Sequence, residues 1–384
     1  MTNFVFETTP RIICETGAAA KLGTLAAELG LRKVLLVTDK GLVQAGILAP
    51  VLDGFAAAKV AVEVFSDVQA DPPEASVDAA VASARTAGID GVVGLGGGSS
   101  LDTAKLVALL AGNPQALPDI YGIGLAKGPR LPLIQVPTTA GTGSEVTPIA
   151  IVTTPTHEKK GVVSPLLYPD IAVLDGALTT GLPAAVTAMT GIDAMVHAIE
   201  AFTTRHKKNP LSDGLAIKAL ELLFFNIRKV IADGGDLDAR NAMLQGSMLA
   251  GMAFANAPVA AVHALAYPLG GHFHVPHGHS NALVLVPVLR FNAEVARRSY
   301  AKLAAIILPG QVFASATEAS NAFIDAMDTL VAEMPFAQRL RDVGVSETDL
   351  PMMAKDVMAI QRLLINNPRD VTEADALALY RSVY

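Results

Sequence analysis

The chain has 384 residues, of which 51% are hydrophobic, 17% are charged and 5% are aromatic. This length predicts about two domains with a sizeable core, and the composition excludes a disordered protein. The net charge is −7 and the densest basic cluster is only RHKK (205–208), so we expect neither a nucleic-acid nor a membrane partner. Cys14 is the single cysteine, and the N-terminus lacks a basic segment followed by an apolar run, so we expect a cytoplasmic protein.

Short β-branched runs alternate with alanine-rich helical stretches in the first part of the chain. Strands are predicted at 33–39, 61–67, 91–97 and 131–137, with helices at 76–88 and 100–112. Strands joined by helices in this way are typical of a largely parallel, nucleotide-binding sheet. Residues 149–175 predict further strands and a hairpin that still belong to this first domain.

After Pro183 the pattern becomes helical, and the remaining strand signal is a weak one at 281–288. We therefore predict an α/β domain over 1–183 and an all-helical domain over 184–384. Between Arg240 and Arg290 there is no Asp, Glu, Lys or Arg. Polar residues, prolines and glycines interrupt this stretch before it reaches the length of a membrane span, so we interpret it as the buried interior of the second domain.

A glycine-rich stretch, GLGGGSSLDTAK (94–105), follows a predicted strand and opens a predicted helix. Gly96, Gly97 and Gly98 allow a ligand to approach the backbone closely, and Ser99 and Ser100 suit a helix start, whose free N–H groups attract phosphate. A tight strand-to-helix turn would also use glycine. Three consecutive glycines at this place favour the pyrophosphate of a dinucleotide.

Two further features fit a nucleotide site. The loop PTTAGTGSEVT (137–147) follows a strand and carries the hydroxyls of Thr138, Thr139, Thr142 and Ser144, which suit contacts with phosphate, ribose or a nicotinamide amide. Asp39 ends the first strand, where a carboxylate accepts hydrogen bonds from the adenosine ribose and repels a 2′-phosphate, which favours NAD over NADP. Without the glycine loops, an ordinary turn aspartate would be the preferred interpretation of Asp39.

A carboxylate and an imidazole share one face of the predicted helix TGIDAMVHAIEAF. Asp193 and His197 are four residues apart, so together they can hold a divalent cation. Glu200 would be a further ligand or an outer partner of the site. A single histidine on an apolar helix is more often a core residue, and a metal site therefore needs more donors.

Five of the eight histidines lie in HALAYPLGGHFHVPHGHSNA (263–282). We expect His263 on a helix that ends at Gly270 and Gly271, and His277 in a tight turn of the following loop. One helical and one loop histidine facing Asp193 and His197 would complete a site of one carboxylate and three imidazoles. The spacing alone does not exclude the remaining three, which are His272, His274 and His279.

These four motifs, in this order and spacing, resemble the iron-containing (type III) alcohol dehydrogenase family over essentially the whole chain. The resemblance implies a Rossmann-like α/β N-terminal domain and an all-α metal- and substrate-binding C-terminal domain, the dehydroquinate synthase-like architecture, usually in a homodimer. It implies NAD(H) and Fe²⁺, with Zn²⁺ as the alternative metal. The implied metal ligands are Asp193, His197, His263 and His277. The implied cofactor contacts are Asp39, Gly97, Gly98, Ser99, Asp102, Thr138, Thr139, Thr142, Ser144 and Lys160.

One position departs from the family pattern. Many members have a second histidine in HALAHPLGG that helps pass a proton to solvent, whereas this chain has Tyr267. A phenol, with an ordinary pKa of about 10, is a poor proton acceptor at neutral pH. Tyr267, His277 and His274 are therefore the catalytic candidates, with the cofactor ribose or water as other routes for the proton.

The resemblance implies a metal-dependent oxidoreductase that interconverts a primary alcohol or short diol with its aldehyde. The alternatives in the same superfamily are a maleylacetate-type oxoacid reductase and a hydroxyacid–oxoacid transhydrogenase. Both would favour cations near the substrate, as would a dehydroquinate synthase-type lyase, and residues 241–289 contain none. A non-catalytic metal sensor would use the histidines but leave both glycine loops without a purpose.

Overall fold

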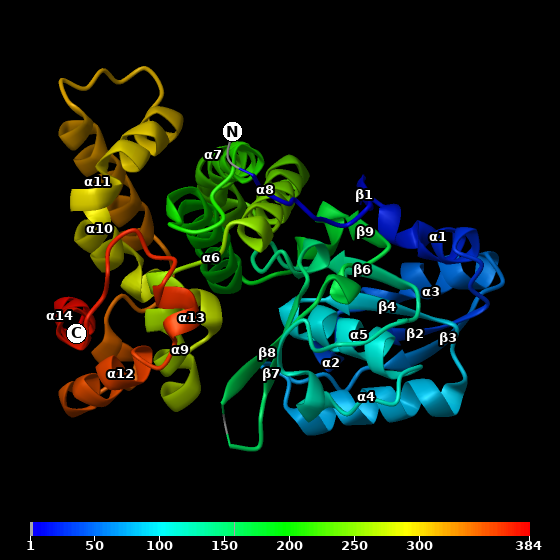
Figure 1. The fold of residues 1–384 in the computed structure, drawn as a ribbon. Coiled ribbons are helices and arrows are strands. Elements are labelled where there is room, and N and C mark those ends of the chain that lie inside the picture. The colour runs from blue at the N-terminus through cyan, green and yellow to red at the C-terminus, as the bar shows by residue number, and fades with distance from the viewer. Residues whose placement is uncertain (1–2, 157) are drawn as a thin grey trace. The chain divides into compact units, whose positions relative to one another are not determined.

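The computed structural model describes residues 3–156 and 158–384, which form two compact units (Figure 1). One unit comprises Glu7–Gly181 and Gly235–Gln245. The other comprises Leu182–Gly234 and Gly246–Tyr384, with the N-terminal residues up to Phe6. The chain passes from the first unit to the second after Gly181, close to the boundary expected at residue 183. The short return of the chain at 235–245 was not predicted, because its helical periodicity does not reveal which unit it packs against.

The α/β unit is built on a six-stranded parallel sheet with the order β1-β9-β6-β4-β2-β3. The strands are β1 (Arg11–Cys14), β2 (Lys33–Val37), β3 (Ala61–Phe65), β4 (Gly91–Gly96), β6 (Leu133–Pro137) and β9 (Ile171–Leu174). β2, β3, β4 and β6 confirm the four predicted strands. β4, β6 and β9 are buried along their whole length, as is usual for a parallel sheet covered on both faces.

Helices cover both faces of this sheet. Val34 and Leu36 of β2 pack with α1 (Leu22–Glu28) and α3 (Leu48–Ala57), whereas Leu35 and Val37 pack with α4 (Glu74–Ala87) and α5 (Gly98–Leu110). This alternation follows from the two-residue period of a strand. Figure 1 shows α1 and α4 on opposite sides of the sheet. The predicted α/β domain with a largely parallel sheet is thereby confirmed.

A smaller sheet and a short helix complete the elements of this unit. β7 (Ile149–Thr153) pairs antiparallel with β8 (Lys159–Val163), which confirms the predicted hairpin, and β5 (Gly122–Ile123) pairs parallel with β8. The helix α2 (Lys40–Gln44) follows β2 directly.

All regular elements among the described residues of the second unit are helices, as predicted. Its helices are α6 (Ala184–Thr203), α7 (Pro210–Ala232), α9 (Ala261–Phe273), α10 (His277–Ile307), α11 (Ala316–Ala332), α12 (Leu350–Val357), α13 (Gln361–Leu364) and α14 (Glu373–Ser382), together with the end of α8 (Leu237–Asn256). α10 packs against α6, α9 and α11. The described residues contain no single helix long and apolar enough to span a membrane, and α8 and α9 reach that length only as a sharply bent pair.

Two local expectations were wrong, and the weak strand signal does not correspond to a strand. The weak strand signal at 281–288 lies inside α10, which is long enough for its packing to override the β-branched residues. Gly270 and Gly271 do not end α9, which continues to Phe273 before His274 adopts the left-handed conformation. The predicted histidine loop is therefore short, and His277 is the first residue of a helix instead of part of a turn.

Candidate active site

Four side chains from three helices converge in the helical unit. Asp193 and His197 come from α6, His263 from α9 and His277 from the start of α10. Each offers one donor atom, and these atoms all lie within 4.8 Å of one another. His263 Nε2 lies 3.9 Å and His277 Nε2 lies 3.7 Å from Asp193 Oδ1. The structure thus brings together the four residues expected to be metal ligands.

A glycine allows α10 to begin this close to α6. A Cβ atom on Gly278 would lie 2.3 Å from the carbonyl oxygen of Met189, so a larger residue would push the two helices apart. Pro276 precedes the helix in an extended conformation and directs His277 inward at the first turn. Gly278 therefore sets the distance between His277 and Asp193.

Glu200 fixes the orientation of His263. Its Oε2 lies 2.7 Å from His263 Nδ1 and accepts from the N–H of Ala260 at 2.8 Å, while Oε1 accepts from the N–H of Val262 at 2.7 Å. With Nδ1 donating to this carboxylate, the lone pair lies on Nε2. Nε2 is buried and has no hydrogen-bond partner among the described residues. An unpaired acceptor at this depth is typical of a ring that is held ready for a ligand.

The surroundings favour an ionised Asp193, and burial disfavours the charged form of His263. Burial alone would raise the pKa of Asp193, but His197, His277 and His263, together with the Asn281 amide, hold it below its ordinary value. Asn281 Nδ2 donates to Asp193 Oδ1 at 2.5 Å. Burial, followed by the neighbouring histidines, lowers the pKa of His263 well below its ordinary value. A carboxylate with neutral imidazoles is the donor set that binds a divalent cation.

The other histidines of the segment 263–282 lie outside this cluster. His272 pairs with Asp356 of α12 at 2.7 Å, and His279 Nε2 lies 2.7 Å from the carbonyl oxygen of Ala337. His274 is exposed at the end of α9, and its catalytic role stays a prediction. Tyr267 is half-buried, and its ring centroid lies 6.4 Å from that of His277.

In the α/β unit, the glycine-rich turn and the threonine-rich loop touch each other. α5 begins at Gly98, directly after β4, and its N-cap is Gly97. A Cβ atom on Gly98 would lie 2.8 Å from Thr142 Cγ2, and one on Gly97 would lie 3.6 Å from Thr139. The N–H of Thr138 donates to the carbonyl oxygen of Gly96 at 3.0 Å. The two predicted nucleotide loops therefore form one continuous surface at the carboxyl ends of β4 and β6.

Asp102 and Ser144 are hydrogen-bonded to each other. Ser144 Oγ donates to Asp102 Oδ1 at 2.6 Å, and the N–H of Ile151 donates to Oδ2 at 2.9 Å. Lys105, one turn further along α5, is fully buried and donates to Thr147 Oγ1 and to the carbonyl oxygen of Ile149. These contacts connect α5 to the second loop. They make Asp102 and Ser144 part of the framework of the cofactor loops.

The remaining expected cofactor residues have more ordinary surroundings. Asp39 is half-buried and caps α2 by accepting from the N–H of Leu42 at 3.1 Å. Ser99 Oγ accepts from the N–H of Asp71 at 3.2 Å. Lys160 is exposed on β8, 3.4 Å from Glu158 and above the ring of Tyr121. Of these three, Asp39 keeps one carboxylate oxygen that no described hydrogen bond uses.

Sequence reasoning did not identify Asn281 or Lys105. Asn281 lies four residues after His277, so a search for polar residues on the same helical face as each histidine would have found it. Lys105 lies three residues after Asp102, which is the spacing of an ion pair on a helix.

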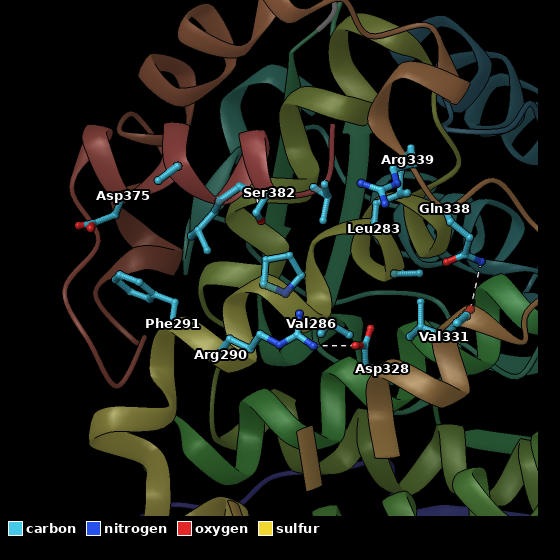
Figure 2. Close-up of a pocket in the computed structure, with 16 residues that line it drawn as sticks. Leu283, Val286, Arg290, Phe291, Asp328, Val331, Gln338, Arg339, Asp375 and Ser382 are labelled. Carbon is cyan, nitrogen blue, oxygen red and sulfur yellow. Dashed lines mark hydrogen bonds and ion pairs between the residues drawn. The ribbon is translucent and has the colours of Figure 1, made fainter. Parts of the chain in front are cut away.

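A separate pocket of about 630 Å³ lies elsewhere in the helical unit (Figure 2). It is lined by residues of α10, α11 and α14, among them Leu283, Asp328 and Leu379, and none of the four clustered donors borders it. Arg290, which also lines it, pairs with Asp328 at 2.6 Å. This pocket is therefore distinct from the donor cluster.

A parallel-sheet unit with a glycine-rich helix start, together with a helical unit that carries an Asp/His₃ donor set, is the combination expected of a metal-dependent dehydrogenase. Residues 9–176 match the model described as iron-containing alcohol dehydrogenase, and residues 187–384 match the C-terminal model of the same family. The chain therefore belongs to the iron-containing alcohol dehydrogenase family, and it is an oxidoreductase.

Individual relatives agree with this assignment. Long-chain-alcohol dehydrogenase 1 of Geobacillus thermodenitrificans is 39% identical over 371 residues, which cover 96% of this chain and 93% of the relative. The crystal structure of a 1,3-propanediol oxidoreductase is 35% identical, with a TM-score of 0.96 and full coverage of both chains. Sulfoacetaldehyde reductase from Bifidobacterium kashiwanohense, solved in complex with NAD⁺, is 28% identical, with a TM-score of 0.90, and the match covers 100% of this chain and 99% of that one.

Proposed function

We propose that this protein interconverts a primary alcohol or short diol with its aldehyde, using NAD(H) and a divalent metal, Fe²⁺ or alternatively Zn²⁺. The observation that carries the proposal is the buried Nε2 of His263, which has no hydrogen-bond partner among the described residues and lies within 4.8 Å of three other donor atoms. Such an arrangement costs stability unless a ligand satisfies it. Related chains named as alcohol and 1,3-propanediol oxidoreductases support the alcohol or diol as substrate.

The four donors fit a divalent cation. Asp193 provides the negative charge, His197, His263 and His277 provide neutral nitrogens, and Glu200 holds the His263 ring in place. When bound, the cation supplies Lewis-acid polarisation of the substrate oxygen, and NAD⁺ supplies the hydride acceptor. The side chain of His277 is one-third exposed, whereas those of Asp193 and His263 are buried, so His277 is the ligand best placed next to substrate and solvent.

The α/β unit supports NAD(H) as the cofactor. The N–H groups at the start of α5 attract a pyrophosphate, and the loop from Thr138 to Thr142 lies beside them. Asp39 at the end of β2 favours a ribose without a 2′-phosphate. His277 and Tyr267 are our candidates for accepting the alcohol proton. His277 is one of the four clustered donors, and the ring centroid of Tyr267 lies 6.4 Å from that of His277.

We further propose a cytoplasmic homodimer that has no nucleic-acid or membrane partner, as the composition and the family resemblance suggest. The proposed function is tested by following nicotinamide absorbance with a panel of alcohols and aldehydes. The metal-free protein is reloaded separately with Fe²⁺ and Zn²⁺ without oxygen. We expect metal-dependent turnover of NAD(H). Cofactor binding without turnover of any panel member would overturn the proposal and favour the oxoacid reductase or lyase alternatives.

A further inference from the structure

A cation reaches the neighbourhood of the donor cluster from a distant part of the chain. Arg362 lies on α13, and its Nη2 donates to the phenol oxygen of Tyr267 at 3.0 Å. Its guanidinium carbon lies 5.6 Å from the centroid of the Tyr267 ring. Arg362 thus both hydrogen-bonds to Tyr267 and contacts its aromatic face.

Tyr267 connects this guanidinium to the cluster. It follows His263 by one helical turn on α9, so both side chains lie on the same face of the helix. Its ring centroid lies 6.4 Å from that of His277.

The charge of Arg362 and most of its N–H donors are not used by other described residues. The side chain is exposed and forms no ion pair among the described residues, in contrast to Arg290, Arg205 and Arg369 of the same unit. One N–H of Nη2 is used by Tyr267, which leaves Nη1, Nε and the second N–H of Nη2. Because the phenol oxygen accepts from Arg362, its own O–H remains available as a donor.

We propose that Arg362 and Tyr267 form an anion subsite that binds a carboxylate or sulfonate at the far end of a short aldehyde or hydroxy substrate. This inference rests on the proposed function and names its substrate class: a hydroxy acid and its semialdehyde, or the corresponding sulfonates. A planar guanidinium donates two parallel hydrogen bonds to such a group, and the phenol adds a third donor without adding charge. Tyr267 in place of the family histidine thus serves to position a cation.

This proposal revises an argument from the sequence. The absence of Lys and Arg from residues 241–289 argued for an uncharged substrate. Arg362 lies outside that stretch, and only the packing of α13 against α9 brings it to Tyr267. The alternative role for Arg362 is to brace Tyr267 without touching substrate, and this role would affect charged and neutral substrates equally.

The test compares two substrates of one carbon skeleton, 4-oxobutanoate and its methyl ester, with NADH and the metal-loaded enzyme; sulfoacetaldehyde serves as the sulfonate. The variants are Arg362→Gln and Arg362→Lys. The matched control is Arg339→Gln, which removes an exposed arginine of the same unit that forms no ion pair among the described residues. Butanoate, an unreactive carboxylate, is titrated as an inhibitor of ester reduction, which measures anion binding separately from turnover of the acid.

We expect Arg362→Gln to lower kcat/KM for an anionic substrate by about 10- to 100-fold, mainly through KM, and to leave the ester within about threefold. The inhibition constant of butanoate should rise by a similar factor, Arg362→Lys should restore part of the loss, and Arg339→Gln should change neither. Equal losses for acid and ester, or a wild-type enzyme that reduces the ester but neither anionic substrate, would overturn the subsite. Failure to reduce any aldehyde at full metal content would instead overturn the proposed function.

Discussion

The donor cluster of the helical unit and the Asp102 network of the α/β unit are both buried and polar, but they differ in what they leave unpaired. In the cluster, His263 Nε2 and Asn281 Oδ1 have no hydrogen-bond partner among the described residues. In the network, both oxygens of Asp102 and the amine of Lys105 are bonded to protein groups. An unsatisfied buried nitrogen among four converging metal-type donors indicates a ligand site, whereas the satisfied atoms of the Asp102 network indicate a framework.

The first prediction tests whether the clustered donors bind a metal ion. We expect His263→Ala to weaken metal binding on the order of 1,000-fold and to abolish metal-dependent turnover, because a four-donor site loses a ligand. Metal content after dialysis, measured by elemental mass spectrometry, checks this. His206→Ala, at an exposed histidine of the same unit, is the control and should keep its metal. Full metal content in His263→Ala would show that these residues are not the ligands.

A second prediction concerns a buried acid next to the network. Burial raises the pKa of Glu145 to about 7 from an ordinary 4.5. The folded state therefore holds this proton more tightly, so its stabilising contribution is complete below pH 4.5 and is lost as the pH rises through 7, by up to about 3 kcal/mol. Glu145→Gln should lose less stability than the wild type between pH 5 and pH 8 in chemical unfolding. Parallel pH profiles for the two proteins would contradict this assignment.

Glu200 supports the cluster from outside, and both of its carboxylate oxygens accept hydrogen bonds. We expect Glu200→Gln to weaken metal binding by about 10- to 100-fold. The amide has one acceptor oxygen for the three N–H groups that now donate to Glu200, and its NH₂ group would face one of the backbone N–H donors. Resistance to a graded series of chelator concentrations measures this. Glu221→Gln, at an exposed acid that pairs with Lys218, should behave like the wild type. Unchanged resistance in Glu200→Gln would remove its positioning role.

Asp102 tests the framework side of the comparison. We expect Asp102→Asn to lower the free energy of unfolding by about 2 kcal/mol, because the buried Lys105 amine loses its counter-charge. NADH affinity, measured by fluorescence, should change by less than about fivefold. A fall in affinity of more than about 30-fold with unchanged stability would instead make Asp102 a direct cofactor contact.

Asp39 should show the smallest effect. Asp39→Ser keeps a side-chain cap for α2 but removes the charge, so stability should stay within about 0.5 kcal/mol of the wild type. The ratio of kcat/KM for NADPH to that for NADH should rise by about tenfold, because the 2′-phosphate is no longer repelled. An unchanged ratio would reduce Asp39 to a helix cap.

Several parts of the site could be predicted from the chain alone. The four-residue spacing of Asp193 and His197 places both on one helical face, and the glycines at 96–98 mark a strand-to-helix turn. The choice of His263 and His277 among five neighbouring histidines came from the family resemblance, because local spacing did not separate them. In the structure, His272, His274 and His279 lie outside the cluster, since α9 continues past its glycines and α10 begins at His277.

By itself, the sequence determined the order of strands and helices, the change of architecture near residue 183 and the two glycine loops, because these depend on local periodicity and backbone preference. Only the tertiary structure decided which polar atoms are paired. Three hydrogen bonds show this. They join Asp102 to Ser144, Glu200 to His263 and Tyr267 to Arg362, which are 42, 63 and 95 positions apart in the chain. Such contacts depend on how helices pack, which local patterns do not specify.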